Sequence, residues 1–153
     1  MNLKEHLLSR EAVKLQASAS TWQEAVKIGT DILEACGTIT PQYYKEIVKS
    51  VEELGPYFLL APGMAMPHAR PEGGVLETSF ALVTLKEAVN FGDPDNDPID
   101  IFITLAAKDA ATQNEEAIVQ VVTLLDEDVT VEKLRKAITL DDLKQIFAEM
   151  ESE

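Results

Sequence analysis

The segment Ala61–Val75 reads APGMAMPHARPEGGV, and it interrupts an otherwise regular alternation of helix-like and strand-like segments. It holds three prolines and three glycines in fifteen residues, together with one histidine and one arginine. Proline fixes its own φ and pushes the preceding residue toward an extended conformation, which here restricts Met66 and Arg70. His68 therefore lies in a restricted stretch of backbone between two glycine regions, as expected of a loop that positions a functional side chain.

His68 offers a neutral, nucleophilic ring nitrogen near pH 7, because an unperturbed imidazole has a pKa of about 6.5. No serine or cysteine stands beside it, and no second histidine lies nearby in the sequence to form a metal pair. Arg70 carries a planar fork of donors that matches a phosphoryl group. The glycines at 63, 73 and 74 allow backbone N–H groups to approach an anion closely. The residues alone leave two interpretations open: a histidine that carries a phosphoryl group, and a structural histidine in a tight turn.

Several motifs extend this pattern: PYF at Pro56–Phe58, LAPG at Leu60–Gly63, AMPH at Ala65–His68 and RPE at Arg70–Glu72. Together with DNDPIDI at Asp95–Ile101 and the helix start at Thr21–Val26, they resemble enzyme IIA components of the bacterial sugar phosphotransferase system (PTS). The resemblance is to the mannitol/fructose type and, within it, to the L-ascorbate-specific branch. It covers essentially the whole chain.

The resemblance implies a cytoplasmic phosphotransferase whose phosphoryl acceptor is His68. The phosphoryl group would come from the histidine phosphocarrier protein HPr and pass to a cysteine of a IIB component, and through it to the membrane component IIC. We expect Arg70 to act as a phosphate clamp, with L-ascorbate or a related sugar as the transported substrate. No cofactor and no metal is expected.

The sequence departs from the family pattern at one position near the expected site. In this family a second histidine commonly lies at the start of the helix that follows the strand corresponding to Ile99–Ala106, and here the alignment places Gln113 there. Glutamine can donate a hydrogen bond to a phosphoryl oxygen but carries no charge. Arg70 or Lys108 would then supply the positive charge. The mannitol-type arginine that precedes the loop also lacks a counterpart, since glutamates occupy positions 52 and 53.

The substitution at Gln113 leaves a second function open, a regulatory IIA-like binding module whose phosphorylation state is read by a transcription factor or a transporter. A metal hydrolase is disfavoured, because no histidine, cysteine or carboxylate cluster has ligand spacing. The acidic run Asp93–Asp97 resembles the start of a calcium loop. Such a loop needs glycine at its sixth position and glutamate at its twelfth, where this chain has Pro98 and Thr104. We therefore predict a capped turn before a strand.

The composition is strongly acidic, with 27 acidic and 13 basic side chains and a net charge of −14. This charge argues against nucleic acid and anionic lipid as partners and favours proteins with basic patches, although solubility alone also accounts for it. No apolar run approaches the ~20 residues that cross a bilayer, so we expect no membrane insertion. The single cysteine, Cys36, agrees with a reducing compartment.

Residues 1–153 are expected to form one α/β domain, with a mixed β-sheet sandwiched between helical layers. Continuous apolar runs predict strands that helices cover on both faces; strands are expected over 12–17, 57–60, 79–85 and 99–106. Helices are expected over 3–8, 21–36, 40–54, 112–125, 131–138 and 140–150. A capping box of Thr21 and Glu24 starts one helix, Thr40 caps the next with Pro41 at its first position, and His6 is expected on the surface.

Overall fold

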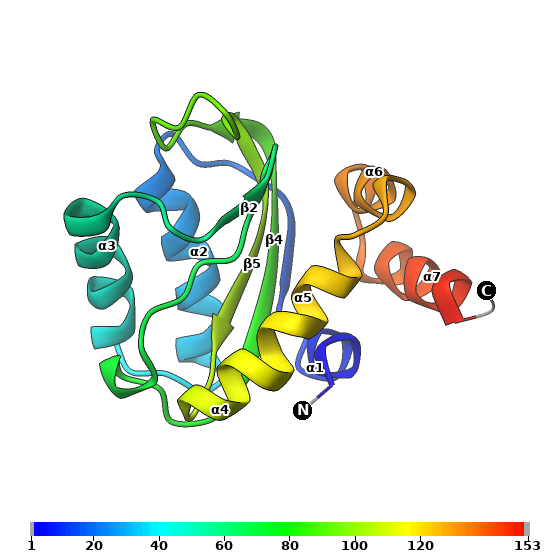
Figure 1. Ribbon diagram of the computed structural model, residues 1–153. Helices are drawn as coiled ribbons and strands as arrows, with labels where there is room; N and C mark the ends of the chain where they lie inside the picture. Colours follow the sequence, from blue (N-terminus) through cyan, green and yellow to red (C-terminus); the bar gives the residue numbers. More distant parts are fainter. Residues whose placement is uncertain (1, 152–153) are drawn as a thin grey trace.

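The computed structural model describes residues 2–151, which form a five-stranded mixed sheet with helices on both faces (Figure 1). The strands lie in the order β1-β4-β5-β3-β2. Pairs β1–β4 and β3–β5 are parallel, whereas β4–β5 and β2–β3 are antiparallel. The strands span Val13–Ala17 (β1), Leu59–Ala61 (β2), Met64–Ala65 (β3), Ser79–Val89 (β4) and Ile99–Ala106 (β5). The predicted α/β architecture with a mixed sheet between helical layers is confirmed.

Two helices cover one face of the sheet, and the others pack on the opposite face (Figure 1). The first layer consists of α2 (Trp22–Ala35) and α3 (Gln42–Leu54). The second consists of α1 (Leu3–Ser9), α4 (Ala110–Thr112), a π-helical turn η2 (Gln113–Ala117), α5 (Ile118–Leu124), α6 (Asp128–Lys136) and α7 (Leu140–Glu151). In β5, Phe102 faces the first layer while Ile101 and Ile103 face the second. Two covered faces explain the continuous apolar run in this central strand.

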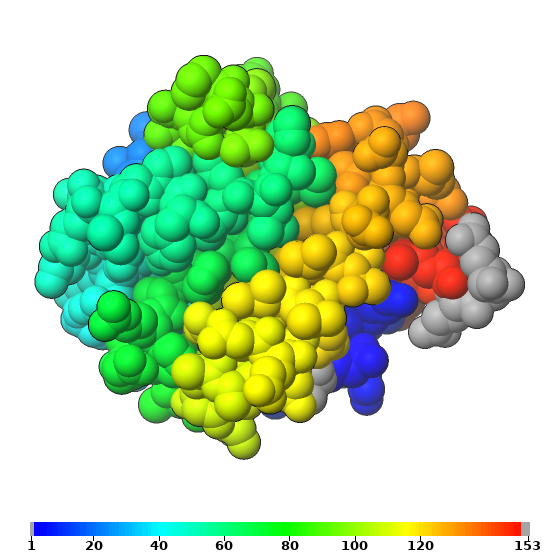
Figure 2. Space-filling model, in the orientation of Figure 1, coloured from blue at the N-terminus to red at the C-terminus, as the bar shows by residue number. Residues whose placement is uncertain are grey.

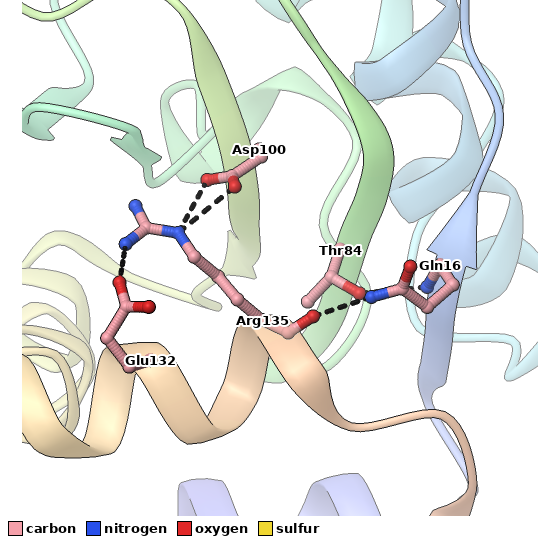
Figure 3. Close-up of polar contacts among 5 residues, drawn as sticks. All are labelled: Gln16, Thr84, Asp100, Glu132 and Arg135. Carbon is pink, nitrogen blue, oxygen red and sulfur yellow. Dashed lines mark hydrogen bonds and ion pairs between the residues drawn. The ribbon is translucent and has the colours of Figure 1, made fainter.

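Polar contacts fix α6 against the end of the sheet at which β5 starts (Figure 3). The Arg135 Nε donates to both carboxylate oxygens of Asp100 at 3.1 and 3.0 Å, and its Nη1 donates to Glu132 at 2.6 Å. The Gln16 amide donates to the Arg135 carbonyl at 2.5 Å, and the Gln16 N–H donates to Thr84 Oγ1 at 2.9 Å. These bonds join the start of β5, β1 and β4 to one helix.

The predicted helix signals are confirmed in part. Thr21 Oγ1 accepts the Glu24 N–H at 3.2 Å and caps α2, but the Glu24 carboxylate binds the Ser20 N–H, not that of Thr21. The prediction for Thr40 was wrong, since α3 begins at Gln42 with Pro41 in the cap position and no side-chain capping bond. Thr40 instead donates its N–H to the Gly74 carbonyl at 2.8 Å. That bond ties the start of α3 to the end of the His68 loop.

His6 was predicted on the surface and is buried, at 3% exposed. The reason is that α1 packs against β4 and α7, so its inward face includes His6 as well as Leu3 and Leu7. The imidazole stands edge-on to the Phe80 ring with centroids 6.1 Å apart. Neither ring nitrogen has a hydrogen-bond partner of normal geometry among the described residues.

Strand and helix boundaries differ from prediction in several places, among them α6, which spans Asp128–Lys136 and not 131–138. Strand β2 starts at residue 59 and not at 57, β4 runs on to Val89, and residues 64–65 of the expected loop form β3. The helix predicted over 112–125 starts earlier and contains the π-helical turn η2. The acidic run is a capped turn as predicted, because the Asp97 carboxylate accepts the backbone N–H groups of Phe91, Gly92 and Asp93.

Candidate functional site

His68 lies on a loop that runs beside the carboxyl end of β5. Strand β3 pairs with β5 through Met64 and Ala65, and the chain then continues along the same strand. The Leu105 N–H donates to the Pro67 carbonyl at 2.9 Å, and the Met66 N–H donates to the Phe58 carbonyl at 2.9 Å. The loop therefore lies at a strand end, where ligands tend to bind in such sheets.

The His68 ring is half-buried and has a defined orientation. Its Nδ1 lies 2.7 Å from the Met66 carbonyl oxygen, which can only accept a hydrogen bond, so Nδ1 carries the proton in this contact. The ring stands edge-on to Tyr57, with centroids 5.5 Å apart, and lies 6.5 Å from the Phe58 ring. A neutral imidazole held in this tautomer presents the lone pair of Nε2.

Burial lowers the pKa of His68 below its ordinary value, and the hydrogen bond to the Met66 carbonyl opposes part of that shift. An imidazole with a lowered pKa is neutral at pH 7. The ring is therefore in its nucleophilic state at neutral pH.

Two tyrosine hydroxyls hold the peptide group that joins His68 to Ala69. The Tyr57 hydroxyl donates to the His68 carbonyl. The Tyr43 hydroxyl, from the buried face of α3, accepts the Ala69 N–H at 3.0 Å and donates to the Leu105 carbonyl at 2.6 Å. The sequence predicts Tyr57 as part of a strand, and its only signal for a role at the site is the PYF motif ahead of the loop. No local signal marks Tyr43.

Arg70 lies on the same loop as His68, two residues later, and no hydrogen bond of the described residues joins the two side chains. Its backbone is extended, with φ −63° and ψ 145°, as Pro71 predicted. The exposed side chain lines a hollow of about 380 Å³ together with Lys49 and Glu46 of α3 and with Glu72. Within residues 2–151 no hydrogen bond or ion pair holds the Arg70 guanidinium, so it is free to reach an anion bound nearby. Lys49 is a second cation at this hollow that sequence analysis missed.

Gln113 occupies the first position of the π-helical turn that follows β5. Its Oε1 is buried and has no hydrogen-bond partner among the described residues. Lys108, the alternative source of charge, lines a separate hollow of about 690 Å³ with Asp109, Thr112 and Glu116. No hydrogen bond or ion pair of residues 2–151 joins Gln113 or Lys108 to His68 or Arg70. π-Helical turns are rare and often mark functional sites.

The elements that carry these side chains reach one face of the molecule (Figure 2). There α3 in cyan, the loop of residues 61–75 in green and the helix that starts at α4 in yellow lie next to one another. In the part of the chain that the structure describes, no three histidine, cysteine, aspartate or glutamate side chains converge on a metal position. No helix between residues 2 and 151 is long and apolar enough to span a bilayer.

Comparison with known proteins gives consistent matches over the whole length. The family model for the "phosphoenolpyruvate-dependent sugar phosphotransferase system, EIIA 2" matches residues 6–150. The ascorbate-specific PTS system EIIA component of Escherichia coli (strain K12) is 50% identical over 147 residues, which are 96% of each chain.

Two solved structures from Escherichia coli share the fold. The mannitol-specific cryptic phosphotransferase enzyme IIA has a TM-score of 0.83 at 35% identity, over 97% of this chain and 99% of that one. The mannitol-specific IIA in complex with phosphorylated enzyme IIB has a TM-score of 0.78 at 25% identity, over 91% of this chain and 95% of that one.

Proposed function

The chain belongs to the EIIA 2 family of the phosphoenolpyruvate-dependent sugar phosphotransferase system, and from this premise we propose that His68 is its phosphoryl acceptor. The protein is a phosphoryl carrier of a sugar phosphotransferase system, and its activity is that of a phosphotransferase. One observation carries the proposal: the Met66 carbonyl occupies Nδ1 and leaves Nε2 of a neutral imidazole available for attack.

In the first step Nε2 of His68 attacks the phosphorus of phospho-HPr. The new N–P bond forms as the N–P bond to the HPr histidine breaks, and the electron pair returns to that histidine. In the second step a cysteine thiolate of a IIB component attacks the same phosphorus and releases Nε2. Exchange between two similar nucleophiles needs positioning and charge neutralisation more than acid–base catalysis.

Charge neutralisation falls to Arg70, whose unpaired guanidinium on an extended backbone is within the loop that carries the acceptor. The Nε2 of the Gln113 amide serves as a weaker donor to a phosphoryl oxygen. Its buried Oε1, which has no partner among the described residues, can only accept a hydrogen bond and does not take part in that contact.

The partners are HPr, the IIB component and through it IIC, and the site of action is the cytoplasm. The complex of the mannitol-specific relative with phosphorylated IIB supports a IIB partner for this chain. The half-identical ascorbate-specific relative supports L-ascorbate as the sugar of the system.

The test is phosphorylation of the full chain by enzyme I, HPr and labelled phosphoenolpyruvate. We expect an acid-labile, base-stable label that His68→Ala abolishes. The matched control is His6→Leu, which removes the other histidine of the chain and should retain the label. Label that persists in His68→Ala would overturn the assignment.

The regulatory alternative is favoured by one observation, the uncharged Gln113 in place of the family's second histidine. A regulatory module would take up label from phospho-HPr but would not pass it on. Loss of label to an added IIB component within the same assay therefore supports transport, and retention supports regulation.

A further inference from the structure

We propose that Tyr57 is a positioning residue for His68, holding the acceptor peptide from the exposed side while Tyr43 holds it from the buried side. The inference rests on the proposed function of His68 and goes beyond it, because it names the device that fixes the imidazole for transfer.

Two tyrosine hydroxyl groups bind the same peptide group, the one that joins His68 to Ala69. The Tyr57 hydroxyl donates to the carbonyl of His68, and the Tyr43 hydroxyl accepts the N–H of Ala69 at 3.0 Å. These two polar atoms belong to the same rigid, planar peptide group. Binding both of them fixes the backbone at the point from which the His68 side chain projects.

Tyr57 also contacts the ring that it positions. Its ring stands edge-on to the imidazole at 5.5 Å and edge-on to Phe58 at 5.1 Å, so the imidazole has an aromatic wall on one side. Edge-to-face packing of this kind favours one ring orientation over others. The Met66 carbonyl holds the ring at Nδ1, and the Tyr57 ring packs against the imidazole from one side.

The two tyrosines differ in access. Tyr43 is fully buried, whereas Tyr57 is 42% exposed, on the surface that a partner must approach to reach His68. Burial raises the pKa of Tyr57, and the neighbouring Ser50 hydroxyl opposes part of the shift, so the phenol stays protonated at pH 7 and can donate. Tyr43 is therefore part of the core. Tyr57 lies outside it, so Tyr57 is the tyrosine to substitute in a test of positioning.

The chain provides a matched control for removing a single hydroxyl. The Tyr44 hydroxyl on α3 also lies near a backbone carbonyl, that of Gln23 at 3.4 Å, and Tyr44 is only partly buried, but it contacts neither His68 nor its loop. Tyr57→Phe and Tyr44→Phe remove the same atom from comparable surroundings. A purely structural role for Tyr57 predicts the same outcome for both variants.

The experiment measures two properties of the full chain. The first is the single-turnover rate of transfer from phospho-HPr, which we expect Tyr57→Phe to lower by about two- to tenfold while Tyr44→Phe matches the wild type. The second is the ¹⁵N NMR signature of the unphosphorylated His68 ring. We expect the Nδ1–H tautomer in the wild type and in Tyr44→Phe, and a shift toward a mixture of tautomers in Tyr57→Phe.

Each outcome has a distinct meaning. A Tyr57→Phe variant with the transfer rate and the tautomer of Tyr44→Phe would overturn the positioning role. Because the NMR measurement needs no phosphoryl transfer, it reports on positioning even if His68→Ala still takes up label. Tyr57→Leu, which removes the ring as well as the hydroxyl, should lower the rate below that of Tyr57→Phe.

Discussion

At the scale of single residues, hydrogen bonds hold the backbone and the imidazole of His68, whereas the guanidinium of Arg70 is not held. The backbone on both sides of His68 is hydrogen-bonded to Phe58, to Leu105 and to two tyrosine hydroxyls. The Arg70 guanidinium, two residues later, has no hydrogen bond or ion pair within the described residues. A held imidazole beside an exposed, unpaired cation suits the proposed transfer from one partner to another.

We predict that Arg70 acts through its charge and fork geometry. Arg70→Gln should slow transfer from phospho-HPr by about ten- to a hundredfold, because charge-assisted hydrogen bonds contribute roughly 1.5–3 kcal/mol. Arg70→Lys should retain part of the rate, and the melting temperature of both variants should hardly change since the side chain is exposed. Lys49→Gln is the matched comparison at the same hollow. If Arg70→Gln transfers phosphate at the wild-type rate and Lys49→Gln is slower, the cation that binds the phosphoryl group is Lys49 of α3 and not Arg70.

The buried His6 predicts how stability depends on pH. Burial lowers its folded-state pKa, the Arg10 charge adds to this, and the Phe80 backbone opposes it. The unfolded chain therefore binds the proton more tightly, so stability is lost as the pH falls below about 6.5, the unfolded value. His68, whose pKa is also lowered, contributes in the same direction.

Urea unfolding at pH 7.5 and at pH 5.5 measures this effect. We expect the wild type to lose stability between the two conditions and His6→Leu to lose less, because leucine fills the apolar site without a titrating group. An equal loss in the wild type and in His6→Leu would assign the pH dependence to other groups.

At the scale of elements, the close approach of α2 to the sheet depends on one glycine. A Cβ placed on Gly29 would lie 2.2 Å from Thr104 Oγ1 of β5, whose hydroxyl is fully buried. Glycine in a helix interior costs about 0.5–1 kcal/mol relative to alanine, and here the close packing requires it.

We predict that Gly29→Ala destabilises the protein by about 1–3 kcal/mol in chemical denaturation, despite the better helix propensity of alanine, because overpacking forces the helix from the sheet. The double variant Gly29→Ala/Thr104→Ala removes the clashing hydroxyl and should recover most of the loss. A Gly29→Ala variant that is as stable as the wild type would show that the helix shifts at no cost.

Much of the fold was predictable because its elements carry local signals. The strand at 99–106 was predicted with its observed bounds, because a continuous apolar run indicates a strand that is covered on both faces even when its neighbours in the sheet are unknown. Strand β3 was not predictable, because two residues become a strand only through pairing with Ile101 and Phe102. The π-helical turn and the buried face of α1 likewise depend on contacts with distant elements.

The same distinction holds for the site. His68 and the extended backbone of Arg70 followed from prolines within the loop itself. Tyr43 and Tyr57 join the site through hydrogen bonds that link residues 11 to 62 positions apart, and no local pattern encodes such contacts.

At the scale of the whole molecule, the net charge of −14 bears on how partners meet it. Acidic side chains also surround the candidate site, since Glu46, Glu53 and Glu72 line the hollow beside Arg70. A negative surface attracts a basic partner over distances up to about 8 Å at physiological ionic strength, beyond which salt screens the interaction. If the charge serves docking, and not solubility alone, the rate of transfer from a basic partner should therefore depend on the salt concentration.

We predict that transfer from phospho-HPr slows as salt rises from 25 to 250 mM (about a tenfold range), because electrostatic steering raises association rates and screening removes it. The position of the charges provides the control. Glu53→Gln/Glu72→Gln removes two charges at the hollow, and Glu5→Gln/Glu11→Gln removes two exposed charges on or next to α1, on the opposite face of the sheet. Both variants have the same net charge, so an effect of total charge alone would weaken the salt dependence equally. Steering to the site predicts that only the first variant loses a substantial part of it, and a transfer rate that is flat with salt in the wild type would leave solubility as the reason for the acidic surface.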